Sequence, residues 1–126
     1  MRLLLDTHIF LWCIKDDIKL PKVTRSKISH GSEVYVSSAS IWECAIKIKL
    51  KKLDGDIDKI VDAIADSGFL ELPITAAHAT FVSKLPDIHR DPFDRMLIAQ
   101  AISEPLTFLT ADEILSNYSK LVEIIN

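Results

Sequence analysis

The chain has 126 residues and a formal net charge of -3, from 15 Lys and Arg against 18 Asp and Glu. This length suits one domain with one hydrophobic core, and 48% hydrophobic with 26% charged residues excludes a disordered or fibrous chain. The net charge excludes a protein that is basic over its whole surface, although it leaves room for a local basic strip that meets nucleic acid.

Targeting signals and disulfides are also disfavoured by the sequence. No apolar run reaches the roughly 18 residues that a membrane helix needs. Asp6 interrupts the apolar stretch at the N-terminus, which is atypical of a secretory signal, and no small-residue cleavage site follows. Cys13 and Cys44 lack the spacing of a metal pair, so we interpret them as free thiols in a reducing compartment. We therefore expect a cytoplasmic protein with no membrane segment.

Short apolar runs alternate with segments of helical periodicity along the chain. Strands are predicted at Leu3–Leu5, Val34–Val36, Phe69–Leu72, Leu106–Leu109 and, with a weaker pattern, Val122–Ile125. Helices are predicted at His8–Ile14, Thr24–Ser29, Ala39–Leu50, Ile57–Ile64, Ala76–Leu85 and Pro92–Ile102, with a short one from Ala111. Buried strands separated by helices are typical of a parallel sheet with both faces covered. No linker or repeat divides the chain, so residues 1–126 are predicted to form one α/β domain.

Asp6 directly follows the first predicted strand. Ligands in parallel α/β folds bind beyond the carboxyl ends of the strands, so this carboxylate is a candidate site residue. The alternative is that Asp6 caps the next helix, a role for which Thr7 competes. Position alone favours neither interpretation.

Glu43 lies among apolar neighbours in the early turns of a predicted helix that Ser37 or Ser38 caps. An acid rarely occurs in such surroundings unless it is paired or bound to a metal. The alternative is a surface ion pair with Lys47 one turn later, worth only about 0.3–0.5 kcal/mol. The pattern therefore favours a site role for Glu43.

Two acids begin the helix predicted from Pro92. Asp91 precedes that proline and is a good N-cap, and Asp94 then falls at the third helical position, where an acid also stabilises the helix start. Asp94 nevertheless shares a face with Leu97 and Ile98, the face that should pack on the sheet. We interpret Asp91 as the cap and Asp94 as the site residue.

Asp112 follows the strand predicted at Leu106–Leu109. Thr110 and Glu113 have the spacing of a capping box, which would place Asp112 at the second position of a short helix. Capping alone would explain an acid there, so Asp112 also has a structural alternative to a site role.

Carboxylates at or just beyond the predicted strand ends therefore gather on one rim of the sheet: Asp6, Glu43, Asp94 and Asp112. Two carboxylates about 5 Å apart repel each other by roughly 3 kcal/mol at an effective dielectric constant near 20. Raised pKa values or a divalent cation would relieve this repulsion. Because oxygen ligands favour Mg²⁺ or Mn²⁺ over Zn²⁺, and none of the four His has zinc-site spacing, the pattern indicates a hard cation.

At this point the sequence resembles the PIN-domain ribonucleases, most of all the toxins of VapBC-type bacterial toxin–antitoxin pairs. The resemblance spans nearly the whole chain and is carried by four blocks in order: LLLDTHIFLW, VSSASIWECAIKIKLKKL, HRDPFDRMLIAQA and LTFLTADE. It implies a three-layer fold whose central parallel sheet has about five strands in the order 3-2-1-4-5. One departure is Lys51, where members often carry a glycine.

The resemblance also implies an activity and a set of site residues. The activity is hydrolysis of single-stranded or looped RNA with one or two Mg²⁺ or Mn²⁺ ions, leaving 5′-phosphate and 3′-hydroxyl ends. Metal-binding or catalytic roles are implied for Asp6, Glu43, Asp94 and Asp112, with Thr110 supporting the pocket. The implied partners are the RNA substrate, a cognate antitoxin and a second copy of the chain in a homodimer.

Basic and apolar residues near these motifs have competing interpretations. Lys47, Lys51, Lys52 and Arg95 are candidate RNA contacts, whereas the lysines alternatively form a solvated helix end and Arg95 alternatively neutralises Asp94. His89 is interpreted as a loop or capping residue. Core or interface roles are expected for Trp12 and Trp42, and the core, a dimer face or an antitoxin groove are alternatives for Phe10, Leu11 and Ile14.

Other functions are compatible with parts of the sequence. A housekeeping RNA-processing nuclease would use the same site without an antitoxin. A haloacid-dehalogenase site would need an acid two residues after Asp6, where His8 stands, and a receiver domain would need an Asp after the third strand, where Pro73 stands. A non-catalytic protein- or RNA-binding module, whose acids only cap helices, is the alternative outside enzymes.

Overall fold

The structure is a computed structural model that describes residues 1–31 and 33–125. Ser32 and Asn126, which the single-domain prediction includes, lie outside the described residues. The strands form one parallel sheet in the order β3-β2-β1-β4-β5, as predicted. Their bounds are β1 Arg2–Leu5, β2 Glu33–Ser37, β3 Leu70–Leu72, β4 Thr107–Thr110 and β5 Val122–Ile124.

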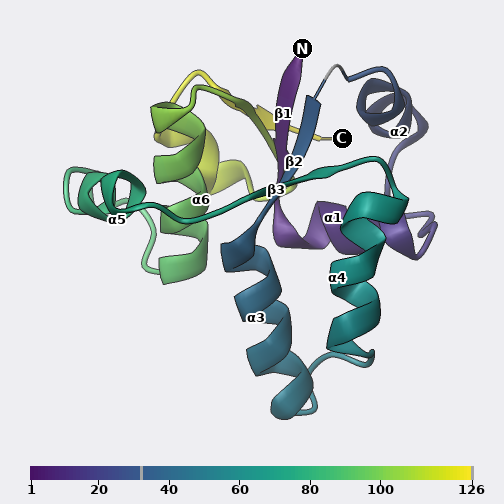
Figure 1. Cartoon of the computed structure of the whole chain (residues 1–126). Coiled ribbons are helices and arrows are strands. Elements are labelled where there is room, and N and C mark those ends of the chain that lie inside the picture. The colour runs from purple at the N-terminus through teal and green to yellow at the C-terminus, as the bar shows by residue number, and fades with distance from the viewer. Residues whose placement is uncertain (32, 126) are drawn as a thin grey trace.

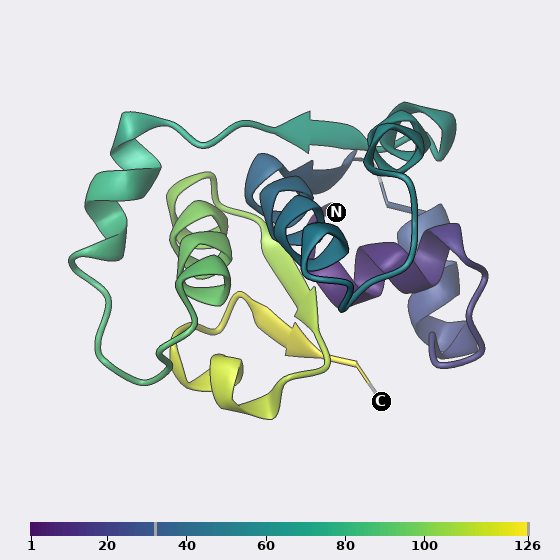
Figure 2. The same cartoon turned by 90° about the horizontal axis from the view of Figure 1, so that it is seen from below.

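Helices connect these strands and lie on both sides of the sheet (Figure 1). The bounds are α1 Thr7–Ile14, α2 Lys22–Ser29, α3 Ser38–Lys49, α4 Ile57–Asp66, α5 Ala76–Val82, α6 Pro92–Ser103 and a 3-10 helix η1 Glu113–Asn117. Seen from below, α5 and α6 lie side by side on the side of the sheet opposite α1 and α2 (Figure 2). None of the helices in the described part of the chain is long and apolar enough to cross a membrane.

The central strand β1 shows why the fold has three layers, with helices on each face of the sheet. Its side chains alternate between the two faces of the sheet. Leu3 and Leu5 pack with Phe10 of α1 in one core cluster, and Leu4 packs with Leu97 of α6 in the other. Because all three leucines are fully buried, both faces of the sheet are covered, as predicted.

Phe10 and Leu11 belong to the first of these clusters. Phe10 is fully buried and Leu11 is 7% exposed, which decides between the alternatives that the sequence left open for them. Neither side chain is available to a partner protein in this structure.

Two predicted elements differ from the observed ones. The strand predicted at Phe69–Leu72 was expected to be buried, but β3 is an edge strand whose Leu70 is 46% exposed. An edge strand pairs on one side only, so one buried side chain, Leu72, suffices to anchor it. The helix predicted to reach Leu85 ends at Val82, and residues 83–85 continue with the tighter i to i−3 hydrogen bonds. Leu85 precedes Pro86, and the residue before a proline is disfavoured in helical geometry.

The strand order also determines where a ligand would sit. From β1 the chain adds β2 and then β3 on one side of the sheet, and it adds β4 and then β5 on the other side. The topological switch point of the sheet therefore lies between β1 and β4. Crevices at the carboxyl ends of strands at such a switch point are the usual binding sites of open α/β sheets. The residues that follow β1 and β4 are Asp6 and Ala111, respectively.

Candidate active site

Asp6 stands where β1 ends and α1 begins. Its backbone N–H donates to the carbonyl of Leu109 on β4 (3.0 Å), so the backbone ladder continues one residue beyond the strand. Asp6 occupies the N-cap position of α1, yet its side chain makes no capping hydrogen bond. Instead, Thr110 Oγ1 donates to Asp6 Oδ2 at 2.5 Å. The carboxylate is therefore held at the strand ends, not at the helix backbone.

Thr110 ties the second strand end to the same point. Its hydroxyl oxygen also accepts from the N–H of Asp112 (3.1 Å), so one side chain joins the segments after β1 and β4. This engagement overturns the predicted capping box: Asp112 is not at the second position of a helix but is itself the N-cap of η1, where Oδ1 accepts from the N–H of Ile114 (3.1 Å). The Thr110 hydroxyl is already used within the site, so the helix begins two residues later than predicted.

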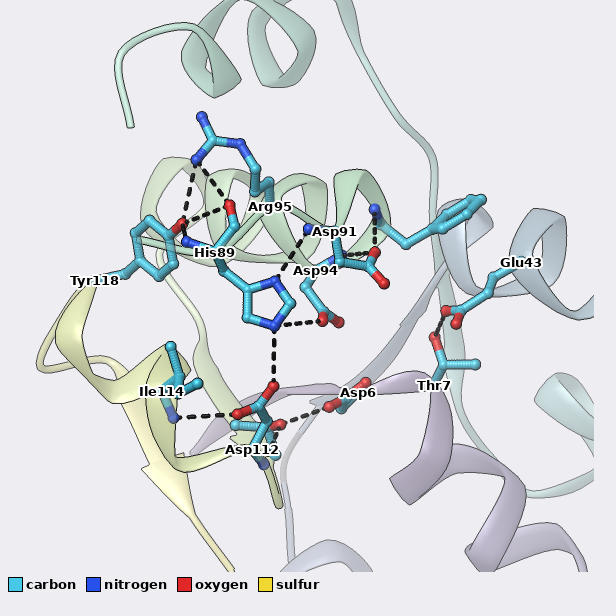
Figure 3. Close-up of polar contacts among 12 residues, drawn as sticks. Asp6, Thr7, Glu43, His89, Asp91, Asp94, Arg95, Asp112, Ile114 and Tyr118 are labelled. Atoms are coloured by element: carbon cyan, nitrogen blue, oxygen red, sulfur yellow. Dashed lines mark hydrogen bonds and ion pairs between the residues drawn. The ribbon is translucent and has the colours of Figure 1, made fainter. Parts of the chain in front are cut away.

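The two acids at the start of α6 differ in their contacts, as the sequence indicates. Asp91 Oδ1 accepts from the N–H groups of Phe93 (2.8 Å) and Asp94 (3.2 Å), which confirms Asp91 as the cap. Asp94 is not needed for that purpose, and its half-buried side chain turns toward the strand ends (Figure 3).

Glu43 is held by side chains of α1 and of its own helix, α3. Ser37 caps α3 by accepting from the N–H of Ala39 (3.0 Å), which places Glu43 in the second turn of the helix. Glu43 is 7% exposed, Thr7 Oγ1 of α1 donates to its Oε1 (2.8 Å), and Lys47 Nζ donates to its Oε2 (2.7 Å). The ion pair with Lys47 that was the alternative to a site role is present, within the pocket itself.

These side chains line one pocket of about 390 Å³. The residues around it are Asp6, His8, Trp12, Glu43, Lys47, Asp91, Asp94, Ala111 and Asp112. The structure therefore brings together all four acids that the sequence singled out, from the ends or starts of different elements. Lys47 is the single cationic side chain among these lining residues.

The electrostatics of the pocket is dominated by its carboxylates. Burial, followed by repulsion from Asp6 and Asp91 and then from Glu43 and Asp112, raises the pKa of Asp94 to about 8. Burial also raises the pKa of Asp6, against the opposing effect of its hydrogen bond from Thr110. The chain thus holds more negative charge here than its own cations balance. Oxygen donors in such excess fit a hard divalent cation such as Mg²⁺ or Mn²⁺.

His89 lies next to two acids of the pocket, a contact that the sequence did not reveal. Its Nδ1 accepts from the N–H of Asp91 (3.0 Å), the loop role that was predicted. Its Nε2 lies 3.3 Å from Asp112 Oδ2 and 3.8 Å from Asp94 Oδ2 (Figure 3). Candidate ligand atoms of these three residues all lie within 4.8 Å of one another. The one available signal was that His89 lies two residues before the cap Asp91, close to the acids of α6.

Arg95 has its guanidinium engaged away from the acids. It donates to the carbonyls of Val82 (3.2 Å), Pro86 (3.0 Å) and His89 (3.4 Å), and so supports the segment between α5 and α6. Among the described residues it forms no ion pair with Asp94. Both terminal nitrogens of the Arg95 guanidinium already donate to these carbonyls. The RNA contact predicted for Arg95 stays a prediction.

The lysine run occupies the end of α3. Lys49, Lys51 and Lys52 are exposed, while Lys47 faces the pocket. The hydrogen bond to Glu43 raises the pKa of Lys47. The run therefore begins at the acids and continues onto the surface, and its contact with RNA stays a prediction.

The tryptophans differ from each other. Trp12 is half-buried at the acidic pocket, whereas Trp42 is 61% exposed, and its ring meets that of Phe93 edge-on at 5.2 Å between centroids. Trp42 and Phe93 line a second, apolar pocket of about 240 Å³ between α3, α5 and α6. A core role is therefore excluded for Trp42.

Comparisons with known proteins agree with this geometry. The sequence matches the PIN domain family over residues 3–121. No curated protein matches the chain in sequence. Among solved structures, the fold is similar to a chain of VapBC2 from Rickettsia felis bound to a DNA fragment from its promoter, with a TM-score of 0.74, 17% identity and full coverage of both chains.

Two further solved structures share the fold. One is a DNA-bound VapBC from Salmonella typhimurium, with a TM-score of 0.68, 17% identity and coverage of 99% of this chain and 97% of that one. The other is a toxin–antitoxin complex from Klebsiella pneumoniae, with a TM-score of 0.67, 15% identity and coverage of 96% and 95%. At these identities the likeness establishes the fold alone.

Proposed function

Because the chain belongs to the PIN domain family, we propose that it is a metal-dependent endoribonuclease that cleaves single-stranded or looped RNA. The observation that carries this proposal is the convergence of acids from separate elements on one pocket, where the pKa of Asp94 is raised to about 8. Such mutual repulsion is costly for a domain that only needs helix caps. It is expected where a cation is to be bound.

The donor set supports a definite division of roles. Asp6 and Asp94 are the proposed direct ligands of one or two Mg²⁺ or Mn²⁺ ions, and Glu43 and Asp112 complete the acidic lining. Thr110 orients Asp6 through its hydrogen bond, and Thr7 orients Glu43. A bound divalent cation would supply positive charge to the phosphodiester and would make water more acidic. The acids then hold the reacting groups in place and accept protons from water.

The basic residues support an RNA path beside the acids. Lys47 lies in the pocket, and the exposed Lys51 and Lys52 follow it at the end of α3. Cations in this order would attract the phosphate backbone and make the binding sensitive to salt. Changing Lys51 and Lys52 to Glu should therefore weaken RNA binding at low salt and reduce the slope of affinity against salt concentration.

We further propose that the protein is the toxin of a toxin–antitoxin pair in the cytoplasm. The support is that the similar solved structures are described as VapBC and toxin–antitoxin complexes and that this chain spans nearly their full length. The cognate partner would be an antitoxin protein. A housekeeping RNA-processing nuclease with the same site is the second candidate, and the substrate distinguishes the two.

A homodimer is the proposed state of the free protein. Trp42 and Ile46 of α3 and its C-cap, Leu50, follow one another at intervals of four residues and are 61%, 37% and 58% exposed. Their spacing puts them on one side of the helix, where the stripe continues into the apolar pocket beside Trp42. An exposed apolar stripe of this kind is typical of an interface.

Sequencing RNA ends after induced expression tests the function. The wild type should stop growth and generate new 5′-phosphate ends at specific positions, and Asp94→Asn should generate none. Asp62→Asn, which changes an exposed acid on α4, should behave as the wild type. The same new ends in the wild type and in Asp94→Asn would refute the enzyme and favour a binding module. Ends confined to one maturing precursor RNA, without growth arrest, would favour the housekeeping nuclease.

A further inference from the structure

His89 is fixed in place by its own backbone. Tyr118 Oη accepts from the N–H of His89 (2.7 Å) and lies 3.3 Å from its carbonyl oxygen, to which Arg95 also donates (3.4 Å) (Figure 3). Arg95 in addition donates to Tyr118 Oη (3.2 Å). The side chains of Tyr118 and Arg95, from separate parts of the chain, therefore both hold the backbone of this loop residue.

The imidazole ring has a defined tautomer. Nδ1 accepts the N–H of Asp91 at 3.0 Å, and a nitrogen that accepts a hydrogen bond carries no proton. The ring proton of the neutral imidazole is therefore on Nε2. The carboxylate oxygen nearest to Nε2 is Oδ2 of Asp112, 3.3 Å away, and Oδ2 of Asp94 lies at 3.8 Å.

Asp112 has a neighbouring group at each of its oxygens. Oδ1 accepts from the N–H of Ile114, and Oδ2 lies 3.3 Å from Nε2 of His89. A hydrogen bond at one oxygen and a ring nitrogen close to the other restrict the rotation of the carboxylate. Partners of this kind, behind a group that binds a metal, tune its affinity and geometry.

The same tautomer argues against His89 as a ligand. To bind a cation through Nε2, the ring would have to move its proton to Nδ1, where it would meet the N–H of Asp91. That would break the hydrogen bond beside the cap of α6, the helix that carries Asp94. Nε2 therefore carries a proton and does not act as a metal ligand, although it lies within 4.8 Å of oxygens of both acids.

We propose that His89 is a positioning residue: its Nε2–H orients Asp112, and the cation is left with oxygen ligands only. This inference rests on the proposed metal-dependent function. It adds a residue that none of the acids implies, and it predicts that the site discriminates against cations that prefer nitrogen ligands, such as Zn²⁺.

Two substitutions distinguish the contribution of Nδ1 from that of Nε2. In His89→Asn the side-chain oxygen can take the place of Nδ1 and accept from Asp91, but the side chain is too short to reach Asp112. In His89→Gln the longer amide can donate to Asp112. A positioning role therefore predicts that Mn²⁺ affinity, measured by calorimetry, falls about 10–100-fold in His89→Asn and much less in His89→Gln. His30→Ala, at the end of α2, should bind as the wild type.

The outcomes are distinct for the inference and for the function on which it rests. Equal Mn²⁺ affinity in the wild type and His89→Asn would overturn the inference alone. Lack of Mn²⁺ binding by the wild type would overturn the proposed function. The tautomer is tested without metal by ¹⁵N NMR of the imidazole: a protonated Nε2 is expected, and a protonated Nδ1 would contradict the inference. With Mn²⁺ bound, electron-spin-echo modulation from a directly coordinated imidazole nitrogen would contradict it as well.

Discussion

Asp94 is half-buried at the start of α6, where burial and neighbouring carboxylates raise its pKa to about 8. In the unfolded chain the same group would titrate near 3.9. The folded protein without metal therefore binds a proton at neutral pH that the unfolded chain does not bind. The stability that Asp94 contributes through this proton is fully present below the pKa of the unfolded chain. It is lost as the pH rises through the pKa of the folded protein.

This difference predicts the pH dependence of stability. The free energy of unfolding of the metal-free protein should fall between about pH 4 and pH 8, by no more than about 1.4 kcal/mol per pH unit for one proton. The raised pKa of Asp6 acts in the same direction. Asp94→Asn should be more stable than the wild type at pH 8 and should flatten the profile, whereas Asp62→Asn should keep the wild-type slope. Urea unfolding across this pH range measures the effect, and a wild-type stability that rises toward pH 8 would contradict it.

Thr110 is the residue on which the strand ends depend. Its hydroxyl donates to Asp6 and accepts from the N–H of Asp112, and it is fully buried. Thr110→Val keeps the shape but removes both hydrogen bonds, so we expect a loss of about 1–3 kcal/mol in the free energy of unfolding. Mn²⁺ affinity should fall too, since Asp6 is no longer oriented. Thr110→Ser is the matched control and should retain most of both quantities; if Ser and Val were equally impaired, the hydroxyl would not be the cause.

At this scale the sequence predicted the acids better than their partners. Asp6, Glu43 and Asp94 were identifiable because a carboxylate beside a strand end or on an apolar helix face conflicts with its surroundings. The contacts of His89 and Arg95 with the site and with Tyr118 were not, because a His or Arg in a polar segment does not conflict with its surroundings. Their orientation depends on Tyr118, more than twenty residues further along the chain.

Two helices of the chain end in the same way with different residues. At the end of α4, Gly68 has a φ of 78°, its N–H donates to the carbonyl of Ala65, and the next N–H donates to Ile64. At the end of α3, Lys51 has a φ of 59° and its N–H donates to the carbonyl of Ile48. Both ends have the Schellman arrangement, in which a left-handed residue is usually glycine. Lys51 occupies that position with a side chain.

The comparison predicts a stabilising substitution. The left-handed conformation costs a non-glycine residue roughly 1–2 kcal/mol, and glycine avoids this cost. Glycine also has more conformational freedom in the unfolded chain, which offsets about 0.5–1 kcal/mol of the gain. Lys51→Gly should therefore raise the free energy of unfolding by about 0.5–1 kcal/mol. Gly68→Ala should lower it by about 1 kcal/mol. Denaturant unfolding of both variants measures this, and a destabilised Lys51→Gly would mean that the lysine side chain stabilises the turn by contacts of its own.

The boundaries of elements were less predictable than their existence. The order of strands and helices follows from apolar runs and helical periodicity, which are local. The exposure of β3 follows from its place at the sheet edge, and the late start of η1 follows from the use of the Thr110 hydroxyl by Asp6. Both reasons are tertiary, so no window of sequence around Leu70 or Asp112 contains them.

For the whole molecule, one group of exposed apolar side chains lies on the surface of α3 that is proposed to meet a second copy. Of the three candidates from the sequence, Phe10 and Leu11 are in the core and Ile14 is partly buried against it. The exposed apolar stripe is instead formed by Trp42 and Ile46 of α3 and by its C-cap, Leu50. Stable interfaces bury about 1,200–2,000 Å² in total. The stripe together with the pocket beside Trp42 would form the apolar centre of such an interface.

Trp42→Glu tests the proposed homodimer. A buried, unpaired carboxylate at the centre of an interface is strongly unfavourable, so the variant should be monomeric in analytical ultracentrifugation at concentrations at which the wild type is dimeric. Val61→Glu, at a 40% exposed position on α4, is the control and should remain dimeric. If the wild type is monomeric, or if Trp42→Glu still forms a dimer, then α3 is not the interface.

The net charge of -3 is an average over a surface that has separate acidic and basic regions. Acids are concentrated at the carboxyl ends of β1 and β4, and cations continue from Lys47 along the end of α3. A divalent cation in the pocket would reverse the local charge where a phosphate arrives. An acidic chain is in this way compatible with an RNA substrate.

Cleavage of single-stranded RNA by the purified protein is the most direct test of this account. With Mn²⁺ or Mg²⁺, the wild type should produce fragments with 5′-phosphate and 3′-hydroxyl ends, excess EDTA should abolish cleavage, and Asp94→Asn should be inactive. Full cleavage in excess EDTA, fragments with 2′,3′-cyclic phosphate ends, or equal cleavage by Asp94→Asn would contradict it.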